Sequence, residues 1–296
     1  MKRILIVIML LLVSGLAVIW YAGGYLIAPA QQTVGNPPPF LAAVSRPYQS
    51  DDGNHIAGWL ISGLPHQGVV LLVHGVRADR SDMLPRAIYL HQLGYTVYMI
   101  DLPAHGESQG DFISYGVHEA VAVNTAVRLL RQWYPHEHLG AIGVSLGAAA
   151  VVLAQPKPAL DAVVLESMFP TIEQAVSNRM DFVIGSPAHL LSPLLLWQLP
   201  LRLHISPNQL HPISVIGQIH SPLLIAGGGV DPYTPPNETM QIYNAAQSPK
   251  SLWIVPCAAH VDLYEHAPRE YEQRIGAFLG QYLPQKSDAG DLKDKR

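Results

Sequence analysis

Two patterns of apolar positions divide the chain. Residues 4–27 are almost continuously apolar, whereas residues 48–284 alternate short apolar runs with longer stretches in which apolar residues recur at helical spacing. Short apolar runs separated by amphipathic helices are typical of a largely parallel sheet covered by helices on both faces. The pattern therefore predicts one long apolar helix followed by an α/β domain.

The short apolar runs of the second region predict strands, and the stretches between them predict helices. The predicted strands are residues 69–73, 96–100, 139–143, 161–165, 222–226 and 251–255, preceded by a strand at 56–61 that could run antiparallel. The predicted helices are residues 83–93, 117–134, 146–154, 237–246 and 269–282. Residues 168–221 are longer than a simple crossover and rich in leucine and proline, so we expect them to form a helical cap.

The apolar segment within residues 1–30 is long enough to cross a bilayer. A helix over residues 4–27 would rise about 36 Å, which exceeds the roughly 30 Å of a hydrocarbon core. Lys2 and Arg3 precede the segment, so we expect an uncleaved single-pass membrane anchor that leaves the following domain on the exported side. The alternative is a signal peptide cleaved at the small-x-small motif of residues 28–30, which would release a secreted protein.

The segments that flank the domain have a different composition. Residues 31–47 contain three consecutive prolines and no sustained period, so we predict an extended linker that holds the domain off the membrane. Residues 285–296 are rich in charged and small residues and predict a disordered tail. The α/β domain itself is expected to occupy residues 48–284.

Charge and cysteine content narrow the classes of function. The formal net charge is −4 and no basic patch is evident, which argues against a nucleic-acid partner. The single cysteine, Cys257, excludes an intrachain disulfide and a cysteine-based zinc site. The 14 histidines show no metal-ligand spacing. We therefore expect neither a metal nor a nucleic acid to take part in the function.

A nucleophile motif follows the predicted strand at residues 139–143. Residues 143–147 read Gly-Val-Ser-Leu-Gly and open a predicted helix, which is the G-x-S-x-G pattern of a sharp strand-to-helix turn. Such a turn exposes the hydroxyl of Ser145, and the backbone N–H of Leu146 points to where an oxyanion develops. Val76 follows the strand at 69–73 and is the second candidate oxyanion donor.

Three polar side chains follow the predicted strand at residues 69–73: His74, Arg77 and Arg80. We interpret His74 as a structural loop residue rather than the catalytic base. Arg77 and Arg80 either contact an anionic group of the substrate or pair with nearby acids, and local pairing is the commoner outcome.

A base and an acid follow two later strands. His260 comes after the strand at 251–255, and Asp231 follows the strand at 222–226 through three glycines. His260 would take the proton of Ser145, while Asp231 would fix the imidazole tautomer. Asp231 stands before a proline and could instead only initiate a turn. Glu166 and Asp262 are competing candidates for the acid, but the loop position favours Asp231.

Several motifs taken together resemble the α/β-hydrolase superfamily, over about residues 48–283. They are His74-Gly75, the run Asp-Leu-Pro-Ala-His-Gly-Glu-Ser at 101–108, the Ser145 turn, Glu166-Ser167, Asp231-Pro232 and Ala259-His260. The chain is similar to the esterase and peptidase-like branch of that superfamily, although Ala259 stands where the branch often has glycine. The resemblance implies an α/β-hydrolase fold, a Ser-His-Asp triad and no cofactor.

The expected function is that of a serine hydrolase that cleaves an ester-type substrate, acyl or lipid-like, through an acyl-enzyme on Ser145. An apolar cap favours an apolar acyl group, although its leucines could equally serve only to pack the cap. The alternatives are an acyltransferase, a perhydrolase or a peptidase with the same triad. A catalytically inactive, membrane-tethered binding module is a further alternative.

Overall fold

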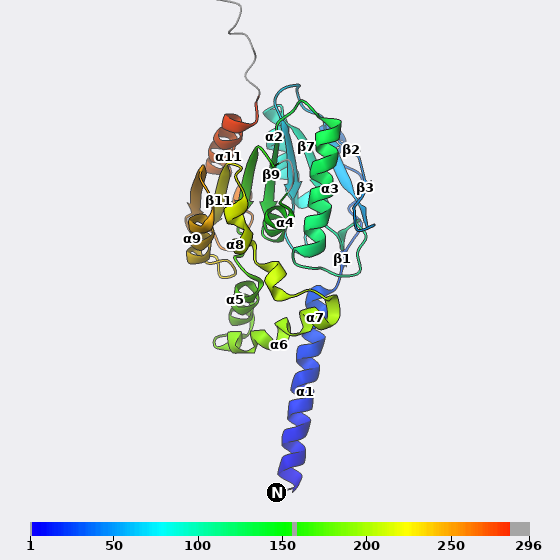
Figure 1. Ribbon diagram of the computed structural model, residues 1–296, viewed down its shortest axis with the longest axis vertical. Helices are drawn as coiled ribbons and strands as arrows, with labels where there is room; N and C mark the ends of the chain where they lie inside the picture. The colour runs from blue at the N-terminus through cyan, green and yellow to red at the C-terminus, as the bar shows by residue number, and fades with distance from the viewer. Residues whose placement is uncertain (1, 156–158, 285–296) are drawn as a thin grey trace, which may run out of the picture.

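An eight-stranded sheet forms the centre of the computed structural model, which describes residues 2–155 and 159–284 (Figure 1). The strands lie in the order β12-β11-β10-β9-β6-β7-β5-β2. Their bounds are β2 Val44–Ser45, β5 Gly58–Ile61, β6 Val69–Val73, β7 Thr96–Ile100, β9 Leu139–Val144, β10 Ala162–Glu166, β11 Leu223–Gly228 and β12 Lys250–Val255. From β7 to β12 the neighbours run parallel, while β5 runs antiparallel to β7 and β2 antiparallel to β5. The predicted, mostly parallel sheet is confirmed.

Two pairs of short strands lie beside this sheet. β1 (Ala30–Gln31) pairs in parallel with β8 (His105–Gly106), and β3 (Tyr48–Gln49) pairs antiparallel with β4 (His55–Ile56). The strand predicted at residues 56–61 is therefore divided at Ala57, between β4 and β5.

The register of the parallel strands brings their carboxyl ends to one edge. Val73, the last residue of β6, is paired with Ile100 of β7 and with Gly143 of β9. Side chains of the loops that follow these strands therefore meet at this edge, which is where the sequence motifs lie.

Helices cover both faces of the sheet (Figure 1). Their bounds are α2 Leu84–Gln92, α3 Val117–Trp133, α4 Leu146–Ala154, α9 Pro236–Ala245, α10 Leu263–His266 and α11 Pro268–Tyr282. Apolar side chains of α3, α4 and α9 pack on one face of the sheet, and those of α2 and α11 pack on the other. This two-sided covering explains why β6, whose residues are at most 1% exposed, is apolar at every position.

The insertion between β10 and β11 forms a helical cap over the carboxyl edge of the sheet. It contains α5 Ile172–Ile184, η3 Ala188–Leu191, α6 Ser192–Leu196, α7 Gln198–Leu203, η4 Pro207–Leu210, α8 Pro212–Val215 and η5 Ile216–Gln218. The cap has a small core of its own, in which Ile172, Leu199 and Leu210 are buried.

The N-terminal helix α1 (Lys2–Ile27) extends away from the body of the molecule (Figure 1). By length and composition it could cross a membrane. Its last turns contact both the cap and the sheet domain: Gln198 Nε2 donates to the carbonyl of Ile19 at 2.9 Å, and Tyr115 Oη donates to that of Leu26 at 2.9 Å.

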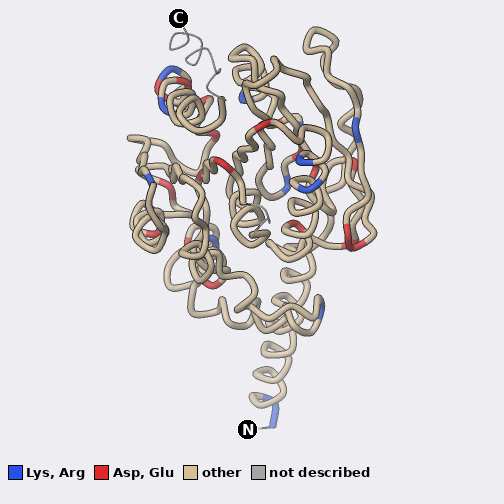
Figure 2. Tube along the Cα trace, turned by 45° about the horizontal axis from the view of Figure 1, so that its top comes forward, with Lys and Arg blue, Asp and Glu red and all other residues tan. Residues whose placement is uncertain are grey.

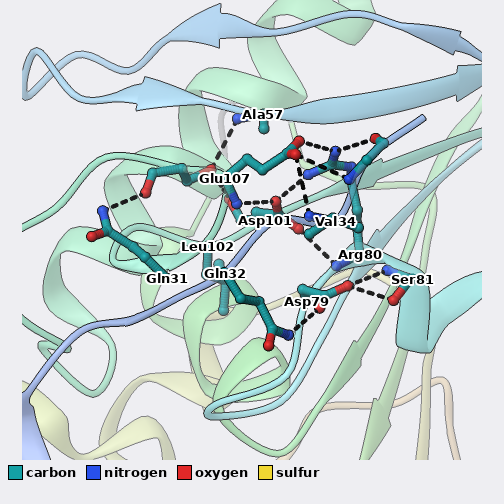
Figure 3. A network of polar contacts seen from close by, with 12 residues as sticks. Gln31, Gln32, Val34, Ala57, Asp79, Arg80, Ser81, Asp101, Leu102 and Glu107 are labelled. Atoms are coloured by element: carbon teal, nitrogen blue, oxygen red, sulfur yellow. Dashed lines mark hydrogen bonds and ion pairs between the residues drawn. The ribbon is translucent and has the colours of Figure 1, made fainter. Parts of the chain in front are cut away.

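Residues 31–47 differ from the predicted spacer, because they run along the domain (Figure 3). Glu107 accepts hydrogen bonds from the backbone N–H groups of Val34 (3.2 Å) and Gly35 (3.0 Å), and Gln32 Nε2 donates to Asp79 at 2.5 Å. Farther along, this segment contains η1 (Pro39–Leu41) and β2. Glu107 and Asp79 thus accept hydrogen bonds from the segment. The segment therefore packs on the domain and does not act as a spacer between the domain and α1. The predicted tail, 285–296, lies outside the described residues.

A buried ion-pair network holds the loops near this segment. Arg80, 2% exposed, pairs with Asp101 and with Glu107, and its backbone N–H donates to Asp101 at 2.7 Å (Figure 3). Burial raises the pKa of the Asp101 carboxyl, against the opposing effect of these donors. Arg80 therefore has the local structural role that the sequence left open.

Candidate active site

Ser145 occupies the turn between β9 and α4 in a left-handed conformation, with φ +50°. Its backbone N–H donates to the carbonyl of Glu166 at 2.8 Å, which ties the turn to the end of β10. The two glycines of the G-x-S-x-G motif are required because backbone atoms of neighbouring segments lie too close to them for a side chain. A Cβ at Gly147 would lie 2.3 Å from the carbonyl oxygen of Val73, and one at Gly143 would lie 2.6 Å from the backbone nitrogen of Ala148.

His260 and Asp231 are brought together at the same edge of the sheet. The Nδ1 of His260 lies 2.8 Å from Oδ2 of Asp231, whose residue is 3% exposed. The other oxygen, Oδ1, accepts the backbone N–H groups of Tyr233 (2.8 Å) and Thr234 (2.9 Å). Asp231 therefore initiates a turn and also faces His260.

The environment of Asp231 keeps its carboxyl ionised. Burial opposes ionisation, but the hydrogen bonds from His260 and Thr234 outweigh it and lower the pKa of Asp231 below its usual value. The Thr234 hydroxyl donates to Oδ2 at 2.7 Å, on the oxygen that also faces His260. Neither Thr234 nor Tyr233 was singled out from the sequence, although both follow Asp231 within the same short loop.

The two competing acids are engaged elsewhere. Glu166 lies 2.6 Å from Arg86 Nη2 and accepts from the Tyr271 hydroxyl at 2.6 Å. Asp262 lies 2.6 Å from Arg86 Nη1 and also caps α10 by accepting the N–H of Glu265 at 3.0 Å. Burial opposes the charge on Arg86, but Glu166 raises the pKa of this guanidinium above its usual value. These carboxylates form an ion-pair cluster around a buried arginine.

His74 is buried between the loops that follow β6 and β7. Its Nδ1 lies 2.7 Å from the carbonyl of Gly75, and its Nε2 accepts the N–H of Leu102 at 2.9 Å. Burial, together with the neighbouring His105, lowers the pKa of His74 to about 3. The ring is therefore neutral and holds two loops in place.

A single pocket contains Ser145, His260 and both candidate oxyanion donors, Val76 and Leu146. Leu146 is the first residue of α4, where backbone N–H groups have no acceptor within the helix. The pocket brings the candidate nucleophile, the candidate base and the two candidate oxyanion donors around one space. Within residues 2–155 and 159–284, no group of three or more His, Cys, Asp or Glu side chains is placed to hold a metal ion.

The walls of this pocket come from the cap and, unexpectedly, from α1. The cap contributes mainly apolar side chains from α5, α6 and α7, and α1 contributes Gly23, Leu26 and Ile27. The long sequence separation between α1 and Ser145 explains why no local pattern indicated this contribution.

Arg77 also lines the pocket, unlike Arg80. Its guanidinium donates to the carbonyl of Tyr25 at 2.5 Å and lies 4.9 Å from the centre of that residue's ring. The last carbonyls of a helix lack intrahelical donors, so Arg77 caps α1 against the sheet domain. The side chain thus joins α1 to the loop that follows β6.

Solved structures share this fold along most of the chain. An esterase from Pyrococcus furiosus, Pf2001, superposes with a TM-score of 0.72 at 23% identity, covering 87% of this chain and 98% of its own. An esterase from Exiguobacterium antarcticum gives a TM-score of 0.61 at 14% identity, covering 80% and 99%. At these sequence identities, the similarity to the two esterases shows a shared fold and nothing about activity.

Curated relatives match over similar lengths. The uncharacterized protein YqkD of Bacillus subtilis is 26% identical over 231 residues, which are 77% of this chain and 76% of YqkD. The uncharacterized protein YfhR of Escherichia coli K12 is 24% identical over 254 residues, which are 82% of this chain and 83% of YfhR. A family profile described as serine aminopeptidase, S33 (Hydrolase_4) matches residues 65–214, about half of the chain. With the doubly covered sheet and the serine turn, this match shows that the chain belongs to the Hydrolase_4 family of α/β hydrolases.

Proposed function

We propose that this protein is a serine hydrolase that cleaves an ester-type, acyl substrate through an acyl-enzyme on Ser145. The observation that carries the proposal is the His260–Asp231 pair, 2.8 Å apart, whose histidine lines the same pocket as Ser145. A nucleophile, an acid and a base in this order along the chain, each in a loop after a strand, are the arrangement that serine catalysis on this fold requires.

The proposed reaction has two halves. His260 takes the proton of Ser145 as the serine oxygen attacks the ester carbonyl, and the N–H groups of Val76 and Leu146 stabilise the oxyanion. The ester C–O bond then breaks, and the alcohol leaves with the proton from His260. Water attacks the acyl-enzyme, His260 takes its proton, and the carboxylic acid leaves as Ser145 recovers its hydrogen. Asp231 holds the imidazole in the tautomer that receives these protons.

The apolar walls of the pocket support an acyl substrate. Most of the side chains that surround Ser145 on the cap side are aliphatic or aromatic, among them Phe169, Ile172 and Leu199. Apolar pockets with a few convergent polar groups are typical of sites for small organic ligands. The Pyrococcus furiosus and Exiguobacterium antarcticum structural neighbours are esterases, which agrees with the proposal.

Peptide hydrolysis is a second candidate, because the matched family is described as serine aminopeptidase. The same triad can also transfer the acyl group to an acceptor other than water. Turnover on a matched panel of ester, thioester and amide substrates, with and without alcohol or amine acceptors, separates these reactions. We expect ester cleavage to dominate. Amide cleavage faster than ester cleavage, or product formation only with an acceptor, would replace the proposal with peptidase or transferase chemistry.

We also propose that α1 stays attached and anchors the hydrolase domain on the exported side of a membrane. The two basic residues before the helix favour this orientation. The contacts of Ile19, Tyr25 and Leu26 with Gln198, Arg77 and Tyr115 support a retained helix, because cleavage after residue 30 would remove them together with part of the pocket wall.

A further inference from the structure

The length of α1 that is free of the body is short for a membrane span. Residues 2–18 rise about 25 Å, and the carbonyl of the next residue, Ile19, accepts a hydrogen bond from Gln198 of the cap. A hydrocarbon core of roughly 30 Å needs about 20 residues. A helix that begins its span near Ile4 therefore ends it near Gly23, at the level where α7 packs against it.

Aromatic residues place the membrane surface at the same level. Trp20, Tyr21 and Tyr25 are 46%, 78% and 63% exposed, and such residues favour the interface between hydrocarbon and water. Arg202 of α7 donates to the carbonyl of Trp20 at 2.5 Å and lies 3.8 Å from the centre of its ring. The cap therefore meets α1 within the interface.

The cap presents an apolar face beside α1. Opposite the buried cap core, several large apolar side chains between α5 and α7 are 39–69% exposed. They include Phe182, Ile184, Leu190, Leu194, Trp197 and Leu201. Between Asp181 and Arg202 the chain contains no Asp, Glu, Lys or Arg. Figure 2 shows the cap and α1 largely without charged residues, in contrast to the sheet domain. An exposed apolar face of this extent indicates an interaction surface.

We propose that this cap face and the end of α1 enter one leaflet of the bilayer together, and that the pocket receives its acyl ester directly from that leaflet. The inference rests on the proposed ester hydrolysis and names its substrate class: an ester whose acyl chain resides in the membrane. Gly23, Leu26 and Leu199 line the pocket between this surface and Ser145, so an acyl chain can pass from lipid to the nucleophile along apolar walls. Hydrolysis releases the fatty acid into the leaflet and the alcohol carrying the proton given by His260.

The test compares two substrates with the full-length protein in dioleoylphosphatidylcholine vesicles. One is a water-soluble umbelliferyl butyrate, and the other is umbelliferyl oleate dissolved in the vesicle. The variant carries Leu190→Glu and Trp197→Glu, two exposed positions outside the pocket lining. The control is Leu64→Glu, a residue 66% exposed in the loop before β6, at the opposite edge of the sheet.

We expect the double variant to lose at least tenfold in oleate turnover while its butyrate turnover stays within twofold of the wild type. The control should leave both rates unchanged. Equal oleate turnover in variant and wild type overturns the inference and leaves the proposed function standing. A wild-type protein that cleaves neither ester overturns the proposed function, and the inference with it.

A second measurement does not depend on the folding of the charged variant. With Cys257 changed to Ser, a single cysteine from Leu194→Cys carries an environment-sensitive fluorophore, and Leu64→Cys is the control. We expect brominated phosphatidylcholine to quench the probe at position 194 but not at position 64. Equal quenching at both positions, or a position-194 probe shielded by a second copy of the chain instead of lipid, contradicts insertion of the cap.

Discussion

At the residue scale, Asp231 divides its two oxygens between two tasks. Oδ1 accepts the N–H groups of its own turn, and Oδ2 faces His260 and the Thr234 hydroxyl. The turn therefore orients the carboxylate before any substrate binds. Because the two oxygens make different contacts, an aspartate before a proline fits either a turn residue or the acid of a triad when only the sequence is known.

We predict that Asp231→Asn keeps the fold but lowers ester turnover by up to about 10⁴-fold, because the amide favours the wrong imidazole tautomer. Steady-state kinetics and a thermal melt of the purified variant measure the two effects. Asp262→Asn is the matched control and should retain most of the turnover, since Asp262 bonds to Arg86 and to the first turn of α10. The assignment is wrong if the two variants exchange these results.

Glu166 is expected to act on stability instead of catalysis. Glu166→Gln removes one partner of the fully buried Arg86, and breaking a buried pair costs up to about 3–5 kcal/mol. Asp262 remains as a partner and reduces this loss. We predict a melting temperature several degrees lower with turnover per folded molecule close to wild type. Asp51→Asn, in an exposed pair with Arg128, should leave the melting temperature nearly unchanged. Loss of turnover at full stability would return Glu166 to the triad.

His74 predicts a dependence of stability on pH. Its folded pKa of about 3 lies below the usual value near 6.5, so the unfolded chain binds a proton that the folded protein does not. Stability from this group is complete above about pH 6.5 and falls as the pH is lowered toward 3, by up to about 1.4 kcal/mol per pH unit.

We predict that His74→Gln, which cannot titrate, reduces the loss of melting temperature between pH 7 and pH 5. The exposed His220→Gln is the control and should retain the wild-type dependence. Identical pH dependence in His74→Gln and wild type would contradict a neutral, buried His74.

At the element scale, the turn from β9 to α4 depends on backbone contact. Gly147 lies against the carbonyls of Val73 and His74, at distances where any side chain forces the backbone to move. The helix α4 can approach β6 only because this position has no Cβ. The position of the Ser145 hydroxyl is therefore coupled to the residue two places later.

Gly147→Ala is predicted to reduce ester turnover and fluorophosphonate labelling by roughly 100-fold, because displacements near 1 Å have effects of about this size. The control is Gly280→Ala in α11, where a Cβ meets nothing within 4 Å. That change should keep full activity and raise stability by about 0.5–1 kcal/mol. An active Gly147→Ala enzyme would show that the close approach does not position the nucleophile.

The elements differ in how far their sequences predict them. β6, β7 and β9 are buried on both faces, so continuous apolar runs mark them clearly. β1 and β8 have two residues each and depend on backbone pairing across the chain, which leaves no pattern of side chains. α6 and α7 have 5 and 6 residues, too few for a helical period to emerge. The cap was therefore predictable as an insertion but not in its helices.

The candidate site, too, could be predicted from the sequence only in part. Ser145, Asp231 and His260 each follow a strand that the pattern predicts, so their common edge could be inferred from the sequence. The engagement of Glu166 by Arg86 and the contribution of α1 to the pocket join residues about 80 or more positions apart. Such contacts depend on the folded topology and have no local signal.

At the scale of the whole molecule, α1 and the sheet domain form one unit instead of two parts joined by a spacer. Residues 31–35 bond to the loop after β7, and Arg77 holds the end of α1 beside the loop that follows β6. The fold therefore fixes the position of the pocket relative to α1, and with it the position relative to the membrane that we propose α1 spans. A soluble domain on a flexible tether would not have this property.

We predict that the intact protein fractionates with membranes and resists extraction by carbonate or high salt. In sealed vesicles with the outer face exposed, added protease should reach the catalytic domain and not Lys2. N-terminal sequencing of the mature protein is the control, and a chain that begins near Gln31 would establish a cleaved signal instead of an anchor.

Catalysis by Ser145 is the central claim, and labelling with a fluorophosphonate tests it most directly. The full-length wild type and Ser145→Ala are compared in the same detergent, with thermal melts to show that both are folded and with ester turnover measured in parallel. The wild type should label, whereas Ser145→Ala should not label and should lose several orders of magnitude in turnover. Equal labelling of a folded Ser145→Ala protein would contradict the account, because the nucleophile would then lie elsewhere in the chain.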